Sequence, residues 1–192
     1  MGAGLKQPDE DVEAVEVAPD CAQKKAEDGW DECMCAQVCE MVKAYNNSPH
    51  RKARLATSPS NAPSGSAPRL AYNASIRNFV KEFAAVVAKH EGNPDHPEIK
   101  SKFYSPPAGN PPPPKADCQH EKWKDDKAKA KPARSGDTAM NPDHMHPAGL
   151  SGPLTSANLI WADARVNKTV GGGMDIKPAP KKMKAHSSCN CP

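Results

Sequence analysis

Apolar residues recur at three- to four-residue intervals in two stretches of the chain, and this spacing is typical of one face of an α-helix. The first stretch predicts a helix over residues 21–46, which ends at Asn-Asn-Ser-Pro. The second predicts a helix over residues 74–91, which ends at Gly92. The two apolar stripes consist of Trp30, Met34, Val38, Met41, Val42 and Tyr45, and of Ile76, Phe79, Val80, Phe83, Val86 and Val87. We expect the second stripe to pack against the first helix or against the C-terminal part of the chain.

A different pattern begins near residue 137. Residues 137–147 predict a short strand followed by a turn, and residues 148–157 have the Gly, Ser and Pro content of a loop. "NLIWA" then predicts a second strand, and "DARVNKTV" predicts a short helix that ends at three glycines. Helices followed by a strand-loop-strand-helix unit predict an α+β fold.

Long polar stretches separate these elements. Ser, Pro and Ala dominate residues 48–69, which predict a linker, and eight prolines make residues 93–114 an extended connector. The Lys-rich residues 115–135 favour a short helix or a basic arm. We therefore divide the chain into a disordered acidic leader (1–20), a helical region with a Ser/Pro-rich linker (21–92), a Pro-rich and Lys-rich connector (93–135), an α+β module (136–176) and a basic Cys-containing tail (177–192).

Composition limits the size of the core and separates the charges. Leu, Ile, Val and Phe account for only 23 of 192 residues, so we expect compact patches joined by extended segments rather than one large core. Residues 1–50 carry 11 acidic and 4 basic side chains, a net charge of −7, and the remainder carries 12 acidic and 22 basic side chains, a net charge of +10. A basic segment of this kind attracts polyanions such as nucleic acid. An ordinary solvated surface can carry the same charge, so both interpretations stay open.

The seven cysteines leave three interpretations open. Their odd number argues against a fully paired disulfide framework. The clusters "CMCAQVC" and "SSCNCP" would suit structural zinc, but they lack the CxxC spacing of common zinc ribbons. We therefore favour reduced buried thiols or a few disulfides over zinc.

The N-terminal segment is acidic and lacks the apolar stretch of a signal peptide. No apolar run approaches the roughly 18 residues that cross a membrane. We expect the chain to be synthesised in the cytoplasm and not to enter a membrane, so that export would require a specialised secretion system.

Residues 141–167 contain the side-chain types that hydrolyse a phosphodiester. A carboxylate and an amide oxygen can hold Mg²⁺, and a neighbouring His can take a proton from water. Asp143 and His144 are adjacent, so on a strand they point to opposite sides, and joint action requires a departure from strand geometry. Pro142 and Pro147 favour such a departure. Asn167 lies on the predicted helix.

The pattern "DHMHPAGLSGP…NLIWADARVNKTVG" resembles the HNH endonucleases, which have the ββα-metal fold. The resemblance covers residues 139–174 and implies that His144 is the general base and that Asp143 and Asn167 bind a divalent metal, Mg²⁺ before Mn²⁺, Ni²⁺ or Zn²⁺. It also implies that Asn158 completes the catalytic set by bracing the loop. The sequence departs from the family pattern at Ser151, where Gly is usual.

Further contacts and partners follow from the same resemblance. His146 is an additional candidate for a phosphate or metal contact, and Arg165 and Lys168 are candidates for nucleic-acid contacts. The segment also resembles nuclease domains of bacterial polymorphic toxins, which type VI and related secretion systems deliver. The implied partners are therefore a DNA substrate, an immunity protein and a secretion-system component.

Three alternatives remain open from the sequence. The chain could be a non-catalytic adaptor or interaction protein, with zinc as a stabiliser, since it has seven cysteines and a polyproline segment. It could cut RNA on the same scaffold, because the reacting group is the same phosphodiester. Finally, His144, His146 and Asp163 could support other metal chemistry.

Overall fold

The computed structural model describes residues 15–17, 19–47, 57–103, 118–125, 140–173, 182–189 and 191. Within these residues, helices predominate and the strands are short. In chain order, the elements are β1 (Val15–Val17), α1 (Cys21–Asp28), α2 (Glu32–Asn47), α3 (Ala67–Lys89), α4 (Pro97–Lys100), α5 (Cys118–Asp125), β2 (Met140–His144), β3 (Leu159–Asp163), α6 (Ala164–Gly173) and β4 (Met183–Ala185). This is the α+β composition that the sequence predicts.

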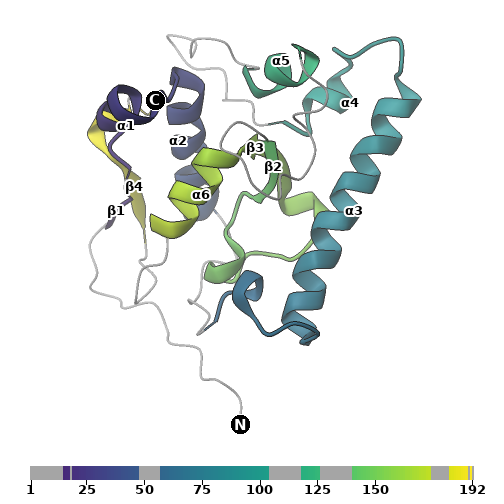
Figure 1. The fold of residues 1–192 in the computed structure, drawn as a ribbon, viewed down its shortest axis with the longest axis horizontal. Helices are drawn as coiled ribbons and strands as arrows, with labels where there is room; N and C mark the ends of the chain where they lie inside the picture. Colours follow the sequence, from purple (N-terminus) through teal and green to yellow (C-terminus); the bar gives the residue numbers. More distant parts are fainter. Residues whose placement is uncertain are drawn as a thin grey trace.

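The antiparallel hairpin of β2 and β3 lies at the centre of the fold, and helix α6 follows β3 directly (Figure 1). The register pairs Met140 with Asp163 at one end and His144 with Leu159 at the other. Helix α6 begins after Asp163 because this carboxylate accepts a hydrogen bond from the Arg165 backbone N–H at 2.9 Å. The strand-loop-strand-helix order therefore agrees with the sequence prediction.

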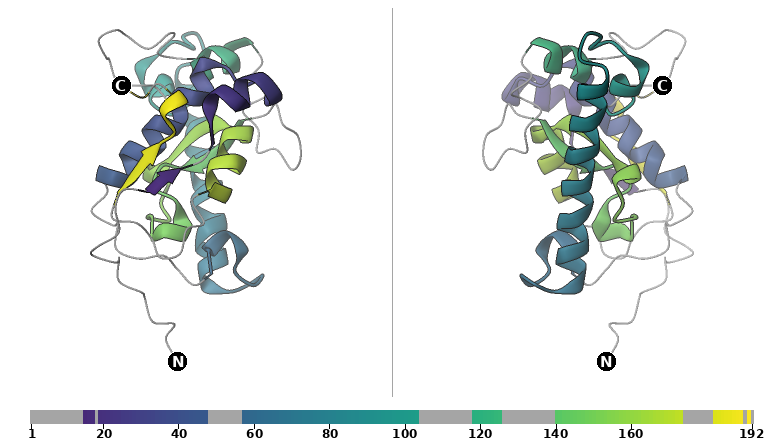
Figure 2. Two further views of the ribbon diagram at one scale, coloured as in Figure 1. Left: turned by 90° about the vertical axis from the view of Figure 1, so that its left-hand side faces the viewer. Right: turned by 90° about the vertical axis from the view of Figure 1, so that its right-hand side faces the viewer.

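Helix α3 covers one face of the hairpin, as the side views show (Figure 2). Phe79 and Phe83 on α3 pack against Trp161, whose side chain is fully buried, with ring centroids 5.5 and 5.4 Å apart. Met140 and Leu159 belong to the same apolar cluster. The second apolar stripe thus packs on the C-terminal hairpin, which is one of the two positions expected for it.

Helices α2 and α6 form a second core on the opposite side of the hairpin. Val166 and Val170 on α6 are fully buried and join the apolar face of α2. All six residues of the first predicted stripe lie in this cluster. Two separate apolar clusters agree with the low content of large aliphatic residues.

Two disulfides join the N-terminal helices to the C-terminal segment. Cys21 on α1 bonds to Cys189, and Cys39 on α2 bonds to Cys191. Cys33 is also disulfide-bonded, whereas Cys35 is a buried free thiol. The cysteines of "CMCAQVC" and "SSCNCP" therefore contribute to disulfides, which was one of the two favoured interpretations, and not to a zinc site built from those clusters.

The strands β1 and β4 pair in parallel beside these disulfides, with Val15 opposite Met183. The Asn46 side chain of α2 holds β4 through two hydrogen bonds to the Met183 backbone, at 2.8 and 2.9 Å. Parts of the expected leader and tail are therefore ordered against each other. Leader residues 1–14, connector residues 104–117 and 126–139, and tail residues 174–181 lie outside the described residues.

Two helix boundaries differ from the prediction. Gly29 has a left-handed backbone conformation (φ 63°) and ends α1, so the predicted helix over residues 21–46 is two helices. Helix α3 begins at Ala67, seven residues before the predicted start, because Ser66 and Pro68 form a helix N-terminus inside the segment expected to be a linker. None of the helices in the described part of the chain is long and apolar enough to span a membrane.

Candidate functional site

Asp143 and His144 lie at the end of β2, and their side chains are buried, with exposed fractions of 8% and 4%. Strand β2 continues through both residues, so their side chains lie on opposite faces of the hairpin. The expected departure at Pro142 is wrong, because Pro142 pairs with Trp161 within the ladder. His144 therefore faces α3, where burial and then the nearby Asp143 charge raise the pKa of Tyr72.

Two side chains from α3 position His144. The Tyr72 ring stacks on the imidazole at a centroid distance of 5.3 Å, and the Ser75 hydroxyl lies 3.3 Å from His144 Nε2. The single Ser75 proton goes to the Tyr72 carbonyl oxygen at 2.8 Å, so His144 must donate its Nε2–H to Ser75. This leaves the lone pair of His144 on Nδ1.

Burial lowers the pKa of His144 to about 4. The imidazole is therefore neutral at pH 7 and can accept a proton, but the same burial makes it a weaker base.

Burial raises the pKa of Asp143 to about 7, and a hydrogen bond from the His144 backbone N–H only partly opposes this. When a buried carboxylate accepts so few hydrogen bonds, a nearby cation stabilises its ionised form. A divalent metal therefore fits Asp143 chemically. Asn167 is half-buried on α6, a helix that contacts both β2 and β3, so the two expected metal ligands lie on elements that touch.

Asn158 immediately precedes β3, and its side chain ties together both ends of the loop at residues 145–157. The amide nitrogen donates to the carbonyl oxygens of His146 and Pro153, at 2.9 and 3.0 Å. The amide oxygen accepts from the His146 backbone N–H at 3.1 Å. This is the bracing contact that the sequence predicts for Asn158, whereas the membership of Asn158 in a catalytic set stays a prediction.

His146 serves the same loop. Its Nε2–H donates to the Leu150 carbonyl oxygen at 2.8 Å, and its ring packs edge-on against Tyr45 at a centroid distance of 5.4 Å. These contacts bury the imidazole to an exposed fraction of 3%. The expected contact of His146 with phosphate or metal would compete with the Nε2 hydrogen bond.

The loop turns sharply at Ser151 and Gly152. Ser151 has a left-handed backbone conformation (φ 66°), which Gly adopts without strain and other residues adopt at a cost. A Cβ added to Gly152 would lie 1.9 Å from the His146 carbonyl oxygen, so this position requires glycine. Ser151 therefore occupies a position whose backbone conformation favours Gly, and it carries a conformational cost there.

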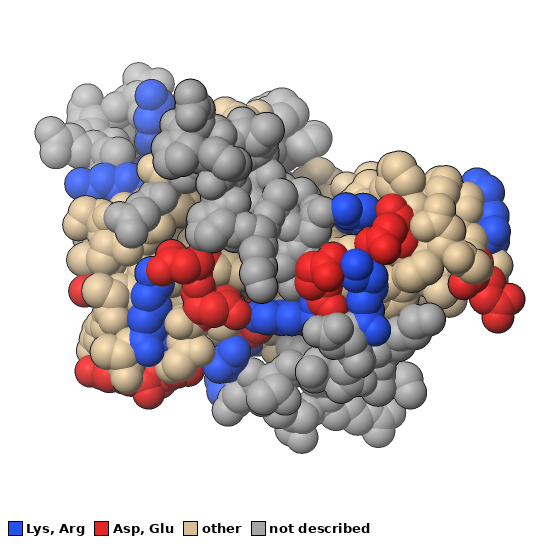
Figure 3. Space-filling view, turned by 90° about the horizontal axis from the view of Figure 1, so that it is seen from above, with Lys and Arg blue, Asp and Glu red and all other residues tan. Residues whose placement is uncertain are grey.

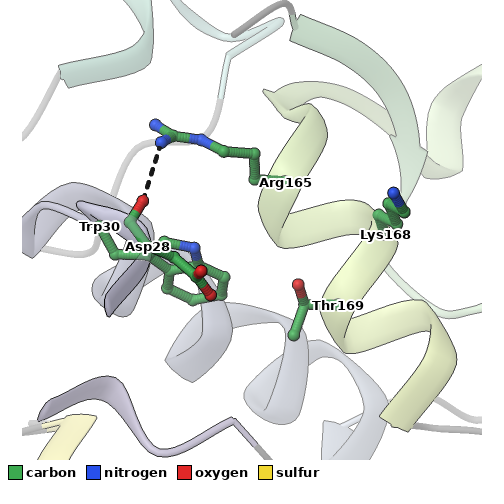
Figure 4. Close-up of a pocket in the computed structure, with 5 residues that line it drawn as sticks. All are labelled: Asp28, Trp30, Arg165, Lys168 and Thr169. Carbon is green, nitrogen blue, oxygen red and sulfur yellow. Dashed lines mark hydrogen bonds between the residues drawn. The ribbon is translucent and has the colours of Figure 1, made fainter. Parts of the chain in front are cut away.

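Helix α6 contributes Arg165 and Lys168 to an open pocket of about 430 Å³ that Asp28, Trp30 and Thr169 also line (Figure 4). Arg165 extends across this pocket and donates to the Asp28 carbonyl oxygen at 3.3 Å. Its Nε also lies 3.5 Å from the Asp163 carboxylate. Arg165 therefore holds α6 against α1, whereas Lys168 is exposed.

The alternative metal set of His144, His146 and Asp163 is not brought together. Asp163 pairs with Met140 and His144 pairs with Leu159, so the two residues lie at opposite ends of the hairpin. A separation of four residues along a strand places His144 and Asp163 roughly 13 Å apart. The Asp163 carboxylate instead caps α6.

Sequence reasoning missed Tyr72 and Ser75, which contact His144 from α3. Their spacing of three places both on one face of a helix, but the predicted helix began after Tyr72. A helix start at Ser-Ala-Pro was the signal that would have added Tyr72 to the helix that already contained Ser75.

Comparison of the chain with protein-family models, with curated proteins and with solved structures found no match. The function is therefore inferred from the residues and their geometry.

Proposed function

We propose that the chain is a metal-dependent nuclease of the HNH kind that hydrolyses phosphodiester bonds of DNA. The observation that carries the proposal is the arrangement of residues 140–173, in which a hairpin, a loop braced by Asn158 and helix α6 follow in the order that the resemblance implies. Asp143 and His144 end the first strand, and Asn167 lies on the helix.

His144 is the proposed general base, and Nδ1 is the proposed acceptor atom. The Ser75 hydroxyl takes the hydrogen bond from Nε2, so the proton removed from the attacking water goes to Nδ1. The depressed pKa of His144 keeps the imidazole neutral before the reaction. Ser75 is a positioning residue, because it fixes which ring nitrogen carries the proton.

Asp143 and Asn167 would hold the divalent metal. When bound, the ion supplies positive charge that stabilises the developing charge on the phosphate and on the leaving oxygen. Asp143 brings a buried carboxylate, and Asn167 brings an amide oxygen from α6. Both are oxygen ligands, which Mg²⁺ prefers.

Substrate access and joint action both require a movement, because Asp143 and His144 are buried and lie on opposite faces of β2. Helix α3 covers the His144 face through Tyr72 and Ser75, so DNA reaches His144 only when this contact opens. Lys168 is exposed on α6 and would contact the backbone phosphates, whereas Arg165 would have to leave Asp28 and Asp163.

The biological setting that we propose is competition between bacteria, with an immunity protein that blocks the site in the producing cell. The disulfides support a destination outside the reducing cytoplasm, because such bonds persist in oxidising compartments. A specialised secretion system would deliver the chain.

The test is nicking of supercoiled plasmid by the purified oxidised protein, with Mg²⁺ or with EDTA. We expect cleavage that requires the metal and that falls about 10²- to 10⁴-fold in His144→Ala. His90→Ala makes the same change at a distant, half-buried imidazole and should cleave like the wild type. The Ser75→Ala variant should shift the pH profile of cleavage, because the tautomer of His144 is no longer fixed.

Cleavage by folded His144→Ala at the wild-type rate would remove His144 from the mechanism. An intact plasmid in every reaction would direct the same assay to RNA, the second substrate that shares the phosphodiester.

One observation favours a non-catalytic interaction protein instead. Both residues expected to act chemically are closed off from solvent in the described structure. If folded protein cleaves neither DNA nor RNA with any divalent metal, the interaction function is the better interpretation.

A further inference from the structure

A buried histidine faces two carboxylates where α5 meets the turn before α4, and both helices lie above the hairpin in Figure 1. His120 on α5 is 1% exposed and packs among Phe103 and Trp123, at centroid distances of 5.4 and 5.6 Å. The carboxylates of Asp95 and Glu121 lie at the surface beside it, with exposed side-chain fractions of 56% and 51%. The site therefore combines one fixed ligand with two adjustable ones.

The tautomer of His120 is already that of a metal ligand. His120 Nε2–H donates to the Pro94 carbonyl oxygen at 2.8 Å, so Nδ1 carries the lone pair. Within the described part of the chain, Nδ1 is buried and has no hydrogen-bond partner. A backbone carbonyl bound to the far ring nitrogen is one of the usual partners that orient a metal-binding imidazole.

The distances suit a single ion. His120 Nδ1 lies 3.9 Å from Asp95 Oδ1 and 3.7 Å from Glu121 Oε1. Two ligand atoms bound at 2.0–2.2 Å to a tetrahedral zinc ion lie about 3.3–3.6 Å apart. Rotations of the two exposed carboxylates supply the remaining few tenths of an ångström.

A cation already lies between the two carboxylates. The Lys124 ammonium contacts Asp95 Oδ1 at 2.9 Å and Glu121 Oε1 at 2.8 Å. Seen from above, acidic and basic side chains lie close together across this face of the molecule (Figure 3). Exposed ion pairs contribute little free energy, so a divalent ion can displace the ammonium at small cost.

We propose that His120 Nδ1, Asp95 and Glu121 bind one zinc ion, with water completing its coordination. One imidazole and two carboxylates around a divalent ion is a ligand set that zinc accepts. The bound ion links α5 to the turn before α4. It thereby holds Trp123 against Phe83 and Phe103 in the core that supports the hairpin.

A neighbouring cluster, His90, His96 and Glu98, is less suited to a metal. His96 Nδ1 accepts the Glu98 backbone N–H at 3.2 Å, so the proton of a neutral His96 lies on Nε2. The rings of His90 and His96 also stack at 3.5 Å, and parallel rings cannot both direct a nitrogen at one ion. A metal there requires loss of both contacts.

The test is a zinc titration of the full-length oxidised chain, with a chromophoric chelator as competitor and unfolding temperature as a second readout. The background is Asp143→Asn, so that binding at the candidate catalytic site does not contribute and the two proposals are tested separately. The variants are Asp95→Asn with Glu121→Gln, Lys124→Ala, and Glu98→Gln as the matched control.

We expect one zinc per chain, binding at least about tenfold weaker in the double variant and tighter in Lys124→Ala, and no change in Glu98→Gln. Zinc should raise the unfolding temperature except in the double variant. The two exposed carboxylates are changed instead of His120 so that the core stays intact. Equal affinity in the double variant, no binding by Lys124→Ala at micromolar zinc, or loss of binding in Glu98→Gln would each overturn the proposal.

Discussion

The Asn158 side chain holds the His146 backbone at both of its polar groups, accepting from the N–H at 3.1 Å and donating to the carbonyl oxygen at 2.9 Å. The same amide nitrogen also reaches Pro153 at 3.0 Å. A side chain at the start of β3 therefore fixes the conformation of the chain just after His144, and so it fixes where β2 ends.

Asn158→Ala should lower the free energy of unfolding by about 2–3 kcal/mol, because three hydrogen bonds to one half-buried amide are lost. Chemical denaturation of the purified protein measures the change. Asn78→Ala, on an exposed face of α3, is the matched control and should leave the stability within about 0.5 kcal/mol of wild type. Equal stabilities of the two variants would mean that the loop does not need the brace.

Gly152→Ala should destabilise the fold by at least about 1–3 kcal/mol, because the new methyl group would meet the His146 carbonyl oxygen at 1.9 Å. Gly149→Ala tests the same change three residues earlier, where the nearest atoms lie at 3.4 Å and the methyl group is accommodated. Thermal unfolding of both variants gives the comparison. A tolerated alanine at Gly152 would show that the loop has another conformation in solution.

Asp143 should make the stability of the fold fall as the pH rises from about 4 to about 7. Its pKa is raised to about 7 in the folded chain, above the usual value near 4 for an unfolded Asp. The folded chain therefore binds the proton more tightly, and this stabilising contribution is lost as the pH rises through that window.

The Asp143→Asn variant cannot titrate at this position, so its advantage over the wild type should grow from pH 4 to pH 7 and then level off. His144 titrates in both proteins, and its contribution cancels in the difference. Urea denaturation in the presence of EDTA, repeated across this pH range, measures the difference. A constant difference would show that the carboxyl group is not buried in solution.

Replacing the Cys21–Cys189 disulfide by two serines should cost about 3 kcal/mol, because Cys39–Cys191 already joins the same two segments and the bond closes a further loop of only about 20 residues in the unfolded chain. Cys35→Ser removes the buried free thiol and keeps every disulfide, so it should cost less. Guanidinium denaturation of oxidised protein distinguishes the two. An equal loss of stability in the two variants would assign the effect to packing rather than to the covalent link.

Local pattern was sufficient for the central elements and insufficient for the contacts between distant ones. The apolar stripes of α2 and α3 and the hairpin with α6 follow from residue spacing, because each buries one face of a regular element. The pairing of β1 with β4 joins two three-residue strands from opposite ends of the chain, and strands so short carry no local signal. Which of the seven cysteines bond to one another likewise could not be predicted from the sequence.

The tetrapeptide Asn-Pro-Asp-His shows why the site was harder to predict than the fold. It occurs at residues 93–96 and again at residues 141–144. The first copy forms a turn whose His96 caps α4, and the second lies in β2 with Asp143 and His144 buried. Partners distant in sequence, such as Ser75 for His144 and His120 for Asp95, decide the environment of each copy.

The disulfide between Cys21 and Cys189 also determines how the molecule responds to mechanical load. A pulling force on the two ends passes through the covalent bond and bypasses the residues between these cysteines, which include the hairpin and α6. The oxidised chain cannot be drawn through a narrow pore as a single extended strand, because the closed loop must enter doubled. Any passage of the chain through a tight channel would therefore have to precede formation of this bond.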